Sequence, residues 1–127
     1  MSKDAECKKS GVVERSFNFS LRILQLCREL EKDSIGRILS RQLLRAGTSI
    51  GANVHEAQGG QSKADFIAKM SIAHKEALET AYWLRLIQQA DLVFGERLSE
   101  LVNETDQLVR IISKILITSK GRKVVSG

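Results

Sequence analysis

Four polar residues near the middle of the chain are spaced to share one side of a helix. Arg45, Ser49, Asn53 and Glu56 follow one another at steps of four, four and three residues. Residues at these steps lie on one stripe of an α-helix. An apolar stripe beside it consists of Ala46, Ile50 and Val54. A guanidinium, two hydrogen-bonding side chains and a carboxylate on one stripe can hold a polar network or a bound ligand.

The segment that follows carries carboxylates at positions where they can complete this network. If two helices run antiparallel about the glycines at 59–60, Arg45 lies opposite residues 74–77 and can pair with Glu76, one turn from Glu79. We therefore predict a structural polar network that fixes helix register or a subunit contact. Its members are Arg45, Ser49, Asn53, Glu56, Glu76 and Glu79. A ligand-binding or catalytic pocket is the disfavoured alternative, because no nucleophile and base accompany the stripe.

Metal chemistry and phosphate binding find little support in the sequence. Neither His55 nor His74 has a glutamate three residues before it, as di-iron bundles require, and His55 lacks the second histidine of an HExxH site. The GGQSK segment at 59–63 lacks phosphate-loop spacing and is interpreted as a cap and turn. We predict no catalytic residue, no metal and no cofactor. An enzyme that uses Glu56, His74, Glu76 or Glu79 is the least favoured hypothesis.

The basic residues are unevenly distributed, although the whole chain carries a formal net charge of only +5. Residues 107–127 hold five Lys or Arg and no Asp or Glu, whereas residues 47–106 hold five against nine. In an antiparallel bundle the end of the fourth helix lies beside the beginnings of the first and third, so that cations gather at one end. The nucleic-acid-binding candidates are Arg15, Lys63, Arg110, Lys114, Lys120, Arg122 and Lys123. The alternative is that they only solvate the protein and favour a helix C-terminus.

The composition favours one small helical domain. The chain has 127 residues, of which 43% are hydrophobic and 5% aromatic, and it has no proline, as in a bundle with an aliphatic core. Its two cysteines lack CxxC spacing, and the first residues contain no apolar signal segment. No stretch reaches the roughly 18 apolar residues of a membrane span. We therefore expect a reduced, cytoplasmic protein that does not bind membranes.

Apolar residues recur with helical spacing in four segments of the chain. Helices are predicted at 13–32, 35–57, 63–90 and 96–119, with caps at Asp33 or Ser34, at Ser62 and at the glycines 59–60. Short connections between helices of similar length favour an all-α, antiparallel up-down-up-down four-helix bundle. The bundle is expected to span residues 13–119, between a mobile N-terminal tail at 1–12 and a basic C-terminal tail at 120–127.

The predicted core includes a wide apolar face on the first helix. Its main stripe is Phe17, Leu21, Leu24, Cys27 and Leu30, and Phe19, Ile23 and Leu26 widen it. On the second helix, Ile35 and Ile38 are assigned to the buried side. Tyr82 and Trp83 lie within an apolar segment and are expected to pack in the interior rather than stack on bases.

Two segments resemble a bacterial protein family. RAGTSIGANVHEA at 45–57 and SKADFIAKMSIAHKEALETAYWLRLI at 62–87 resemble the four helix bundle protein family, also called the 23S rRNA intervening-sequence protein family, over about residues 40–93. The matching positions are Arg45, Ala46, Ser49, Ile50, Asn53, Glu56, Phe66, Ile72, Ala73, Glu76 and Glu79. The chain departs from the family pattern at Ala57, where members commonly have glycine, and at Lys75-Glu76, where many have Gly-Ser.

The resemblance implies a four-helix bundle that assembles as a homopentamer, and it implies no defined activity. Some members are encoded within insertions in ribosomal RNA genes, and a distant relative is the accessory protein of diversity-generating retroelements. These contexts suggest nucleic-acid binding. We therefore expect a non-enzymatic oligomeric bundle that binds RNA or DNA through its basic surface. The alternative is a structural or adaptor module that contacts only proteins.

Overall fold

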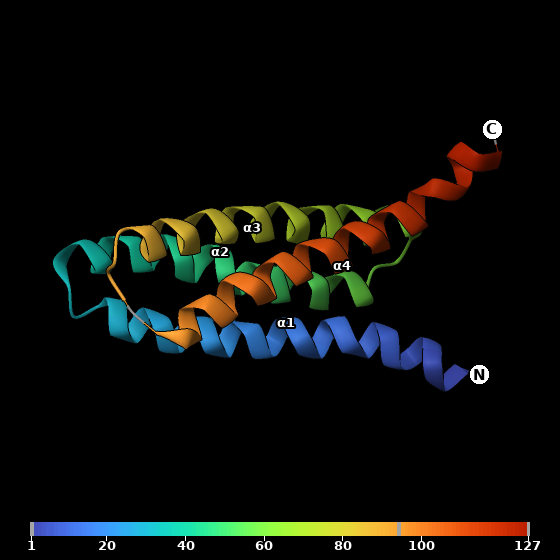
Figure 1. Cartoon of the computed structure of the whole chain (residues 1–127). Coiled ribbons are helices and arrows are strands. Elements are labelled where there is room, and N and C mark those ends of the chain that lie inside the picture. Colours follow the sequence, from blue (N-terminus) through green and yellow to red (C-terminus); the bar gives the residue numbers. More distant parts are fainter. Residues whose placement is uncertain (1, 94, 127) are drawn as a thin grey trace.

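The chain folds into four long helices that run alternately up and down (Figure 1). The computed structural model describes the backbone of residues 2–93 and 95–126 and the side chains of residues 11–93 and 95–121. The helices are α1 (Ser2–Leu30), α2 (Ser34–Gln58), α3 (Lys63–Gln89) and α4 (Glu96–Ser126), and the described backbone contains no strand. This confirms the predicted all-α four-helix bundle.

The inner ends of the helices have the predicted caps. The Asp33 carboxylate accepts the Gly36 amide at 2.8 Å at the start of α2, and the Ser62 hydroxyl accepts the Asp65 amide at 3.1 Å at the start of α3. Gly59 follows the last residue of α2. Each side-chain cap satisfies an amide that has no partner within its own helix, so short polar signals fix these boundaries.

The outer ends of the helices extend beyond the predicted limits. α1 already begins at Ser2 and α4 continues to Ser126, so that helical backbone enters both segments expected to be tails. The predicted limits followed the apolar periodicity. The polar segments beyond it contain Lys and Glu, whose high helix propensity lets the helix continue without an apolar face. The mobility of the two tails stays a prediction.

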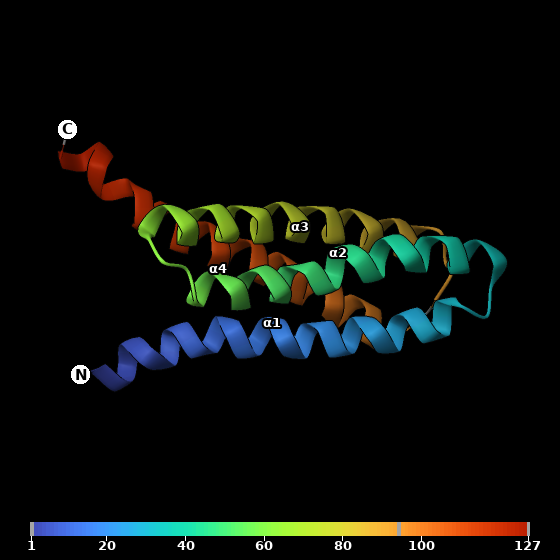
Figure 2. The same cartoon turned by 180° about the vertical axis from the view of Figure 1, so that it is seen from behind.

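The four helices follow one another around the bundle in chain order. α2 packs against α1 and α3, α4 packs against α3, and α1 packs least against α4. α4 lies in front of α2 in Figure 1 and behind it in Figure 2, so these two helices are diagonal to each other. The side formed by α1 and α2 is therefore opposite the side formed by α3 and α4.

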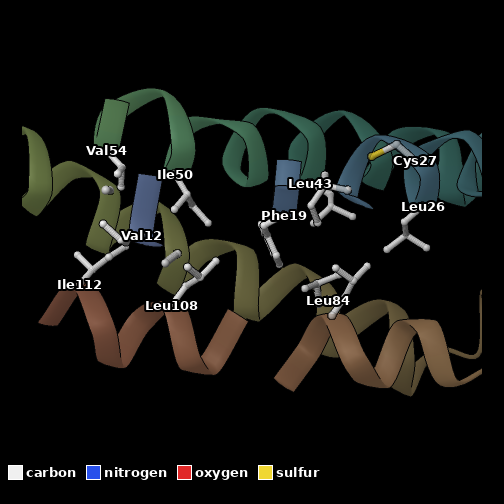
Figure 3. Packing of buried hydrophobic residues seen from close by; sticks show 14 of the residues in the cluster. Val12, Phe19, Leu26, Cys27, Leu43, Ile50, Val54, Leu84, Leu108 and Ile112 are labelled. Carbon is white, nitrogen blue, oxygen red and sulfur yellow. The ribbon is translucent and has the colours of Figure 1, made fainter. Parts of the chain in front are cut away.

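The core between the helices is mostly aliphatic (Figure 3). Its best-covered side chains, at 0–1% exposed, include Phe19, Leu43, Ile50, Leu84, Leu108 and Ile112. Four buried hydroxyls, on Ser16, Ser40, Thr80 and Thr105, each donate to a backbone carbonyl of their own helix. Within the described residues, no buried side-chain nitrogen or oxygen lacks a hydrogen-bond partner, as expected of a stable interior.

The prediction for the buried face of α1 was wrong in part. Cys27 and Leu30 are buried as predicted, and so are the flanking residues Phe19, Ile23 and Leu26. Phe17, Leu21 and Leu24 of the predicted main stripe are exposed, so the core receives the side of α1 that carries Phe19 and Ile23. The glycines of α2 explain this rotation, because they allow α1 to approach closely. A Cβ atom on Gly47 would lie 3.0 Å from the Ile23 side chain, and one on Gly51 would lie 3.1 Å from the Ser16 carbonyl oxygen.

The prediction for the first turns of α2 was also wrong. Ile35 and Ile38, assigned to the buried side, are 57% and 65% exposed. The residues that α2 buries near its start are instead Gly36 and Ser40. Small residues at these positions bring the start of α2 against the end of α1, which apolar periodicity alone does not indicate.

Candidate functional site

An ion pair between α2 and α3 lies at the centre of the predicted polar network. The Arg45 guanidinium lies 3.3 Å from the Glu76 carboxylate and also donates to Glu79. Glu79 accepts a second hydrogen bond, at 3.0 Å, from the indole Nε1 of Trp83. The contact between Arg45 and Glu76 is thus the one that antiparallel packing predicts. The Arg45 side chain is 49% exposed, so the cluster lies on the surface of the bundle.

The other members of the predicted stripe do not join this cluster. The Ser49 hydroxyl donates to the Arg45 carbonyl at 2.6 Å, and the Asn53 amide donates to the Ser49 carbonyl at 2.8 Å. Glu56 pairs with Lys69 at 2.8 Å, and this hydrogen bond and charge hold the pKa of Glu56 below its ordinary value. The stripe therefore contacts α3 through two separate ion-paired groups, one at Arg45 and one at Glu56, while Ser49 and Asn53 bond to carbonyls of their own helix. Its role in register or assembly stays a prediction.

The described residues offer no activated nucleophile or metal centre. No group of three His, Cys, Asp or Glu residues in this part of the chain is placed to hold a metal ion. The Cys27 thiol is buried and donates to the Ser40 carbonyl at 3.4 Å. Burial, with a smaller effect of Glu31, raises the pKa of Cys27 to about 11. Because the thiolate is the reactive form, Cys27 is an inert core residue.

The predicted basic end of the bundle is formed where α4 ends. A cavity of about 700 Å³ there is lined from all four helices, by residues that include Val12, Gln58, Phe66 and Lys114. Residues 111–119 of α4 therefore lie near Val12 of α1 and near the first turns of α3, whereas the final turns of α4 project away from the bundle and from the start of α1 (Figure 1). Lys63, the first residue of α3, lies at the same end.

Arg15 differs from the other basic candidates because carboxylate and amide groups engage it. Its Nε lies 2.5 Å and its Nη2 2.9 Å from the two Glu104 carboxylate oxygens, and Nη2 also donates to Gln107 at 2.6 Å. The hydrogen bonds to Glu104 raise the pKa of Arg15 above its ordinary value. Arg15 therefore joins α1 to α4, and its charge is compensated within the chain.

The remaining candidates occupy several positions on α4. Arg110 lies in a groove between α3 and α4 with Tyr82 and Arg85, and Lys120 is exposed nearer the C-terminus. The side chains of Arg122 and Lys123 lie outside the described residues. Within the described part of the chain, no ion pair involves the four candidates Lys63, Arg110, Lys114 and Lys120.

Two exposed apolar surfaces were not predicted. The first, the α1/α2 face, carries Phe17, Leu21 and Leu24 beside a groove between these helices. The second, the α3/α4 face, carries Leu78, Tyr82 and Leu86 beside a groove between α3 and α4. Tyr82 is 58% exposed, so the expectation of interior packing was wrong for it, although Trp83 is partly buried. The sequence signal for the first surface was the width of the apolar face on α1, which is greater than one buried helix face requires.

Comparisons with known proteins agree with this fold. The family model for the 23S rRNA-intervening sequence protein matches residues 8–114. A crystal structure from Bacteroides thetaiotaomicron, of a protein of unknown function from the S23 ribosomal protein family, is 39% identical with a TM-score of 0.78. The match covers 83% of this chain and 97% of that one.

No curated protein matches the chain. Among the described residues, none of the helices has an apolar stretch of the length needed to cross a membrane. The match of the family model over most of the sequence shows that the chain belongs to the 23S rRNA-intervening sequence protein family.

Proposed function

We propose that the protein is a non-enzymatic, homo-oligomeric bundle that binds nucleic acid in the cytoplasm. The proposed binding surface is the basic end of the bundle, defined by Lys63, Lys114 and Lys120. The observation that carries the proposal is that no ion pair among the described residues compensates these cations. Arg15 is left out of the surface because Glu104 engages it.

The names of the related proteins support RNA as the nucleic acid. The name of the matching family refers to an intervening sequence of 23S rRNA, and the name of the solved relative places it in an S23 ribosomal protein family. The homopentamer implied by the resemblance would bring several basic ends together, and linked weak sites bind a long polyanion more tightly than one site does.

The chemistry of the basic end favours binding to the phosphate backbone. Lysine is a flexible point charge that lacks the planar fork with which arginine recognises guanine. Contacts to phosphate position a protein on nucleic acid but carry no sequence information. We therefore expect affinity that depends strongly on salt and weakly on base sequence.

The test is the salt dependence of binding to single-stranded RNA, duplex RNA and duplex DNA. The variant Lys63→Gln/Lys114→Gln/Lys120→Gln should lose at least tenfold in affinity at low salt. Each neutralised phosphate contact contributes about 0.7–0.9 to the slope of log K against log salt concentration, so loss of three contacts should reduce the magnitude of the slope per chain by about 2.1–2.7. Fluorescence anisotropy at several salt concentrations measures both quantities.

A matched control removes three cations toward the other end of the bundle. Lys32→Gln/Arg41→Gln/Arg97→Gln changes the net charge equally at residues that are exposed and form no described ion pair. This variant should keep most of the affinity. Absence of wild-type binding at low salt, or equal losses in the two variants, would contradict the proposal.

The second candidate function is a structural or adaptor module that contacts only proteins. The two exposed apolar faces favour it, because apolar patches on a soluble bundle mark protein contacts. An oligomer that shows no affinity for any of the three nucleic acids would support this function over the first.

A further inference from the structure

The cavity at the basic end of the bundle has an apolar floor. Its volume of about 700 Å³ lies within the range of about 300–1,000 Å³ that small-molecule sites occupy. Val12 and Met70 line it and are 4% and 0% exposed, and partly buried apolar side chains complete the wall, namely Phe66, Ile111 and Ile115. These side chains offer no hydrogen-bond donor and only the weak acceptor sulfur of Met70. The part of an occupant that reaches the floor must therefore be apolar, because a polar group buried without a partner costs free energy.

The rim of the cavity is polar and positively charged. Gln58, Lys114 and Thr118 line it and are exposed, and Ser119 adds a second hydroxyl. Lys114 and Thr118 are four residues apart on α4, so an ammonium and a hydroxyl are neighbours at the opening. Among the described residues, Lys114 is the only charged side chain in the lining, and it takes part in no ion pair. The rim therefore favours an anion.

The floor and the rim together argue against two kinds of occupant. Metal ions prefer carboxylate, imidazole or thiolate ligands, and none of the described lining residues supplies one. A nucleobase carries N–H and carbonyl groups around its edge, and these would lack partners against the apolar floor. A hydrocarbon chain has no polar group to satisfy there, and its burial removes apolar area from water.

We propose that the cavity binds a small amphipathic anion, namely an alkyl or acyl chain that ends in a carboxylate. The chain lies against Val12, Met70 and Ile115, and the carboxylate accepts hydrogen bonds from the Lys114 ammonium and the Thr118 hydroxyl at the rim. This site goes beyond the proposed function, because its ligand is not a nucleic acid and all of its lining comes from one copy of the chain.

The test is calorimetric titration of the full chain with decanoate, below the concentration at which decanoate forms micelles. One decanoate should bind per chain. Octanoate is two CH₂ groups shorter and should bind up to about fifteenfold more weakly, because each buried CH₂ group contributes about fourfold to the affinity. Decyltrimethylammonium has a chain of the same length but a positive head, so it should bind at least about tenfold more weakly beside the Lys114 ammonium.

Two variants each remove one feature of the site. Lys114→Met keeps an apolar stem without the charge, so decanoate should bind at least about tenfold more weakly while decyltrimethylammonium should not. Thr118→Trp places a large side chain in the opening and should abolish the binding of both probes. Both positions are exposed, so the helical content of each variant should match wild type by circular dichroism. Lys75→Met is the matched control, since Lys75 is exposed and does not line the cavity, and it should bind decanoate like wild type.

A methionine signal reports on the floor of the cavity. The chain contains two methionines, Met1 and Met70, so the nuclear magnetic resonance spectrum of methyl-labelled methionine is simple, and the variant Met70→Leu assigns the signal of the cavity. Decanoate should shift the Met70 methyl signal in proportion to the saturation that calorimetry measures. Binding that leaves this signal unchanged would place the probe elsewhere on the protein and overturn the inference.

Four further results would also overturn it. The first is the absence of decanoate binding, and the second is equal affinity for decanoate and decyltrimethylammonium. The third is a Lys114→Met variant that binds decanoate like wild type. The fourth is a decanoate affinity that weakens as the protein concentration rises, which would assign the cavity to a segment of a second copy. None of these results decides the salt-dependent binding of nucleic acid, which anisotropy measures separately.

Discussion

Arg45 is half exposed, yet its side chain contacts two carboxylates of α3. It bridges Glu76 and Glu79, and Glu79 in turn holds the indole of Trp83. Exposed ion pairs contribute only about 0.2–1 kcal/mol. Glu76 is only 15% exposed, however, so removal of its partner leaves a partly covered carboxylate without its counter-charge.

We predict that Arg45→Met lowers the free energy of unfolding by about 1 kcal/mol, from the upper range of exposed pairs. Urea unfolding at fixed protein concentration measures the change. Arg41→Met, one turn earlier and without a described ion pair, should have almost no effect. If the network also serves assembly, light scattering should show a lower mass for Arg45→Met. Intact assembly with lost nucleic-acid binding would point to a binding site.

Cys27 should titrate only at strongly alkaline pH. A thiol with the ordinary pKa of 9.0 is half ionised at pH 9, whereas Cys27, with its pKa raised to about 11, is ionised to about 1%. In a Cys7→Ser background, iodoacetamide should therefore modify the folded protein at least tenfold more slowly than the unfolded protein. Similar rates would show that the thiol is accessible.

The same thiol gives the stability a dependence on pH. Because the pKa is raised by folding, the unfolded chain loses the thiol proton first as the pH increases. This contribution to stability is complete below about pH 9 and is lost as the pH rises to about 11. Replacing Cys27 by serine, which keeps a donor for Ser40 but does not ionise in this range, should make the stability decline less between pH 9 and 11.

At the scale of the helices, small residues set how closely α1 and α2 approach. Gly36 lies at the beginning of α2, where an added Cβ atom would overlap with the carbonyl oxygen of Leu30. Backbone atoms cannot move aside as a flexible side chain can. Gly11 is the opposite case, since nothing lies within 4 Å of an added Cβ.

We predict opposite effects for alanine at these two glycines. Gly36→Ala should destabilise the protein by about 1–3 kcal/mol, because the turn between α1 and α2 must shift. Gly11→Ala should stabilise it by up to about 1 kcal/mol, since alanine favours a helix interior over glycine. Urea midpoints of the two variants measure both changes. Equal effects of the two would contradict the close approach at Gly36.

The sequence predicted the helices better than it predicted their rotation. Caps such as Asp33 and Ser62 are local signals, and the structure confirms them. The exposed positions of Phe17 and Tyr82 were missed because apolar periodicity locates an apolar side without saying whether the core or another molecule covers it. The Arg45–Glu76 pair was predictable because a short turn fixes the register of α2 against α3.

In the whole molecule, the exposed apolar faces and the proposed nucleic-acid-binding surface lie apart from each other. The apolar faces lie along the sides of the bundle, whereas Lys63 and Lys114 lie at one end. Lateral assembly through the sides therefore leaves the basic end accessible. If neighbouring copies are related by rotation about an axis along the bundle, all basic ends of a ring lie on the same side of it.

The weak packing between α1 and α4 has a consequence for how fast the chain folds. The contacts of α2 with α1 and α3, and of α3 with α4, join helices that are adjacent in sequence, so each pair can form as a local hairpin. Helical proteins dominated by such local contacts fold within microseconds to milliseconds. Closure between α1 and α4, where Arg15 reaches Glu104, joins the two most distant helices and is the step with the largest loop-closure entropy. We expect this seam to form last and to open first.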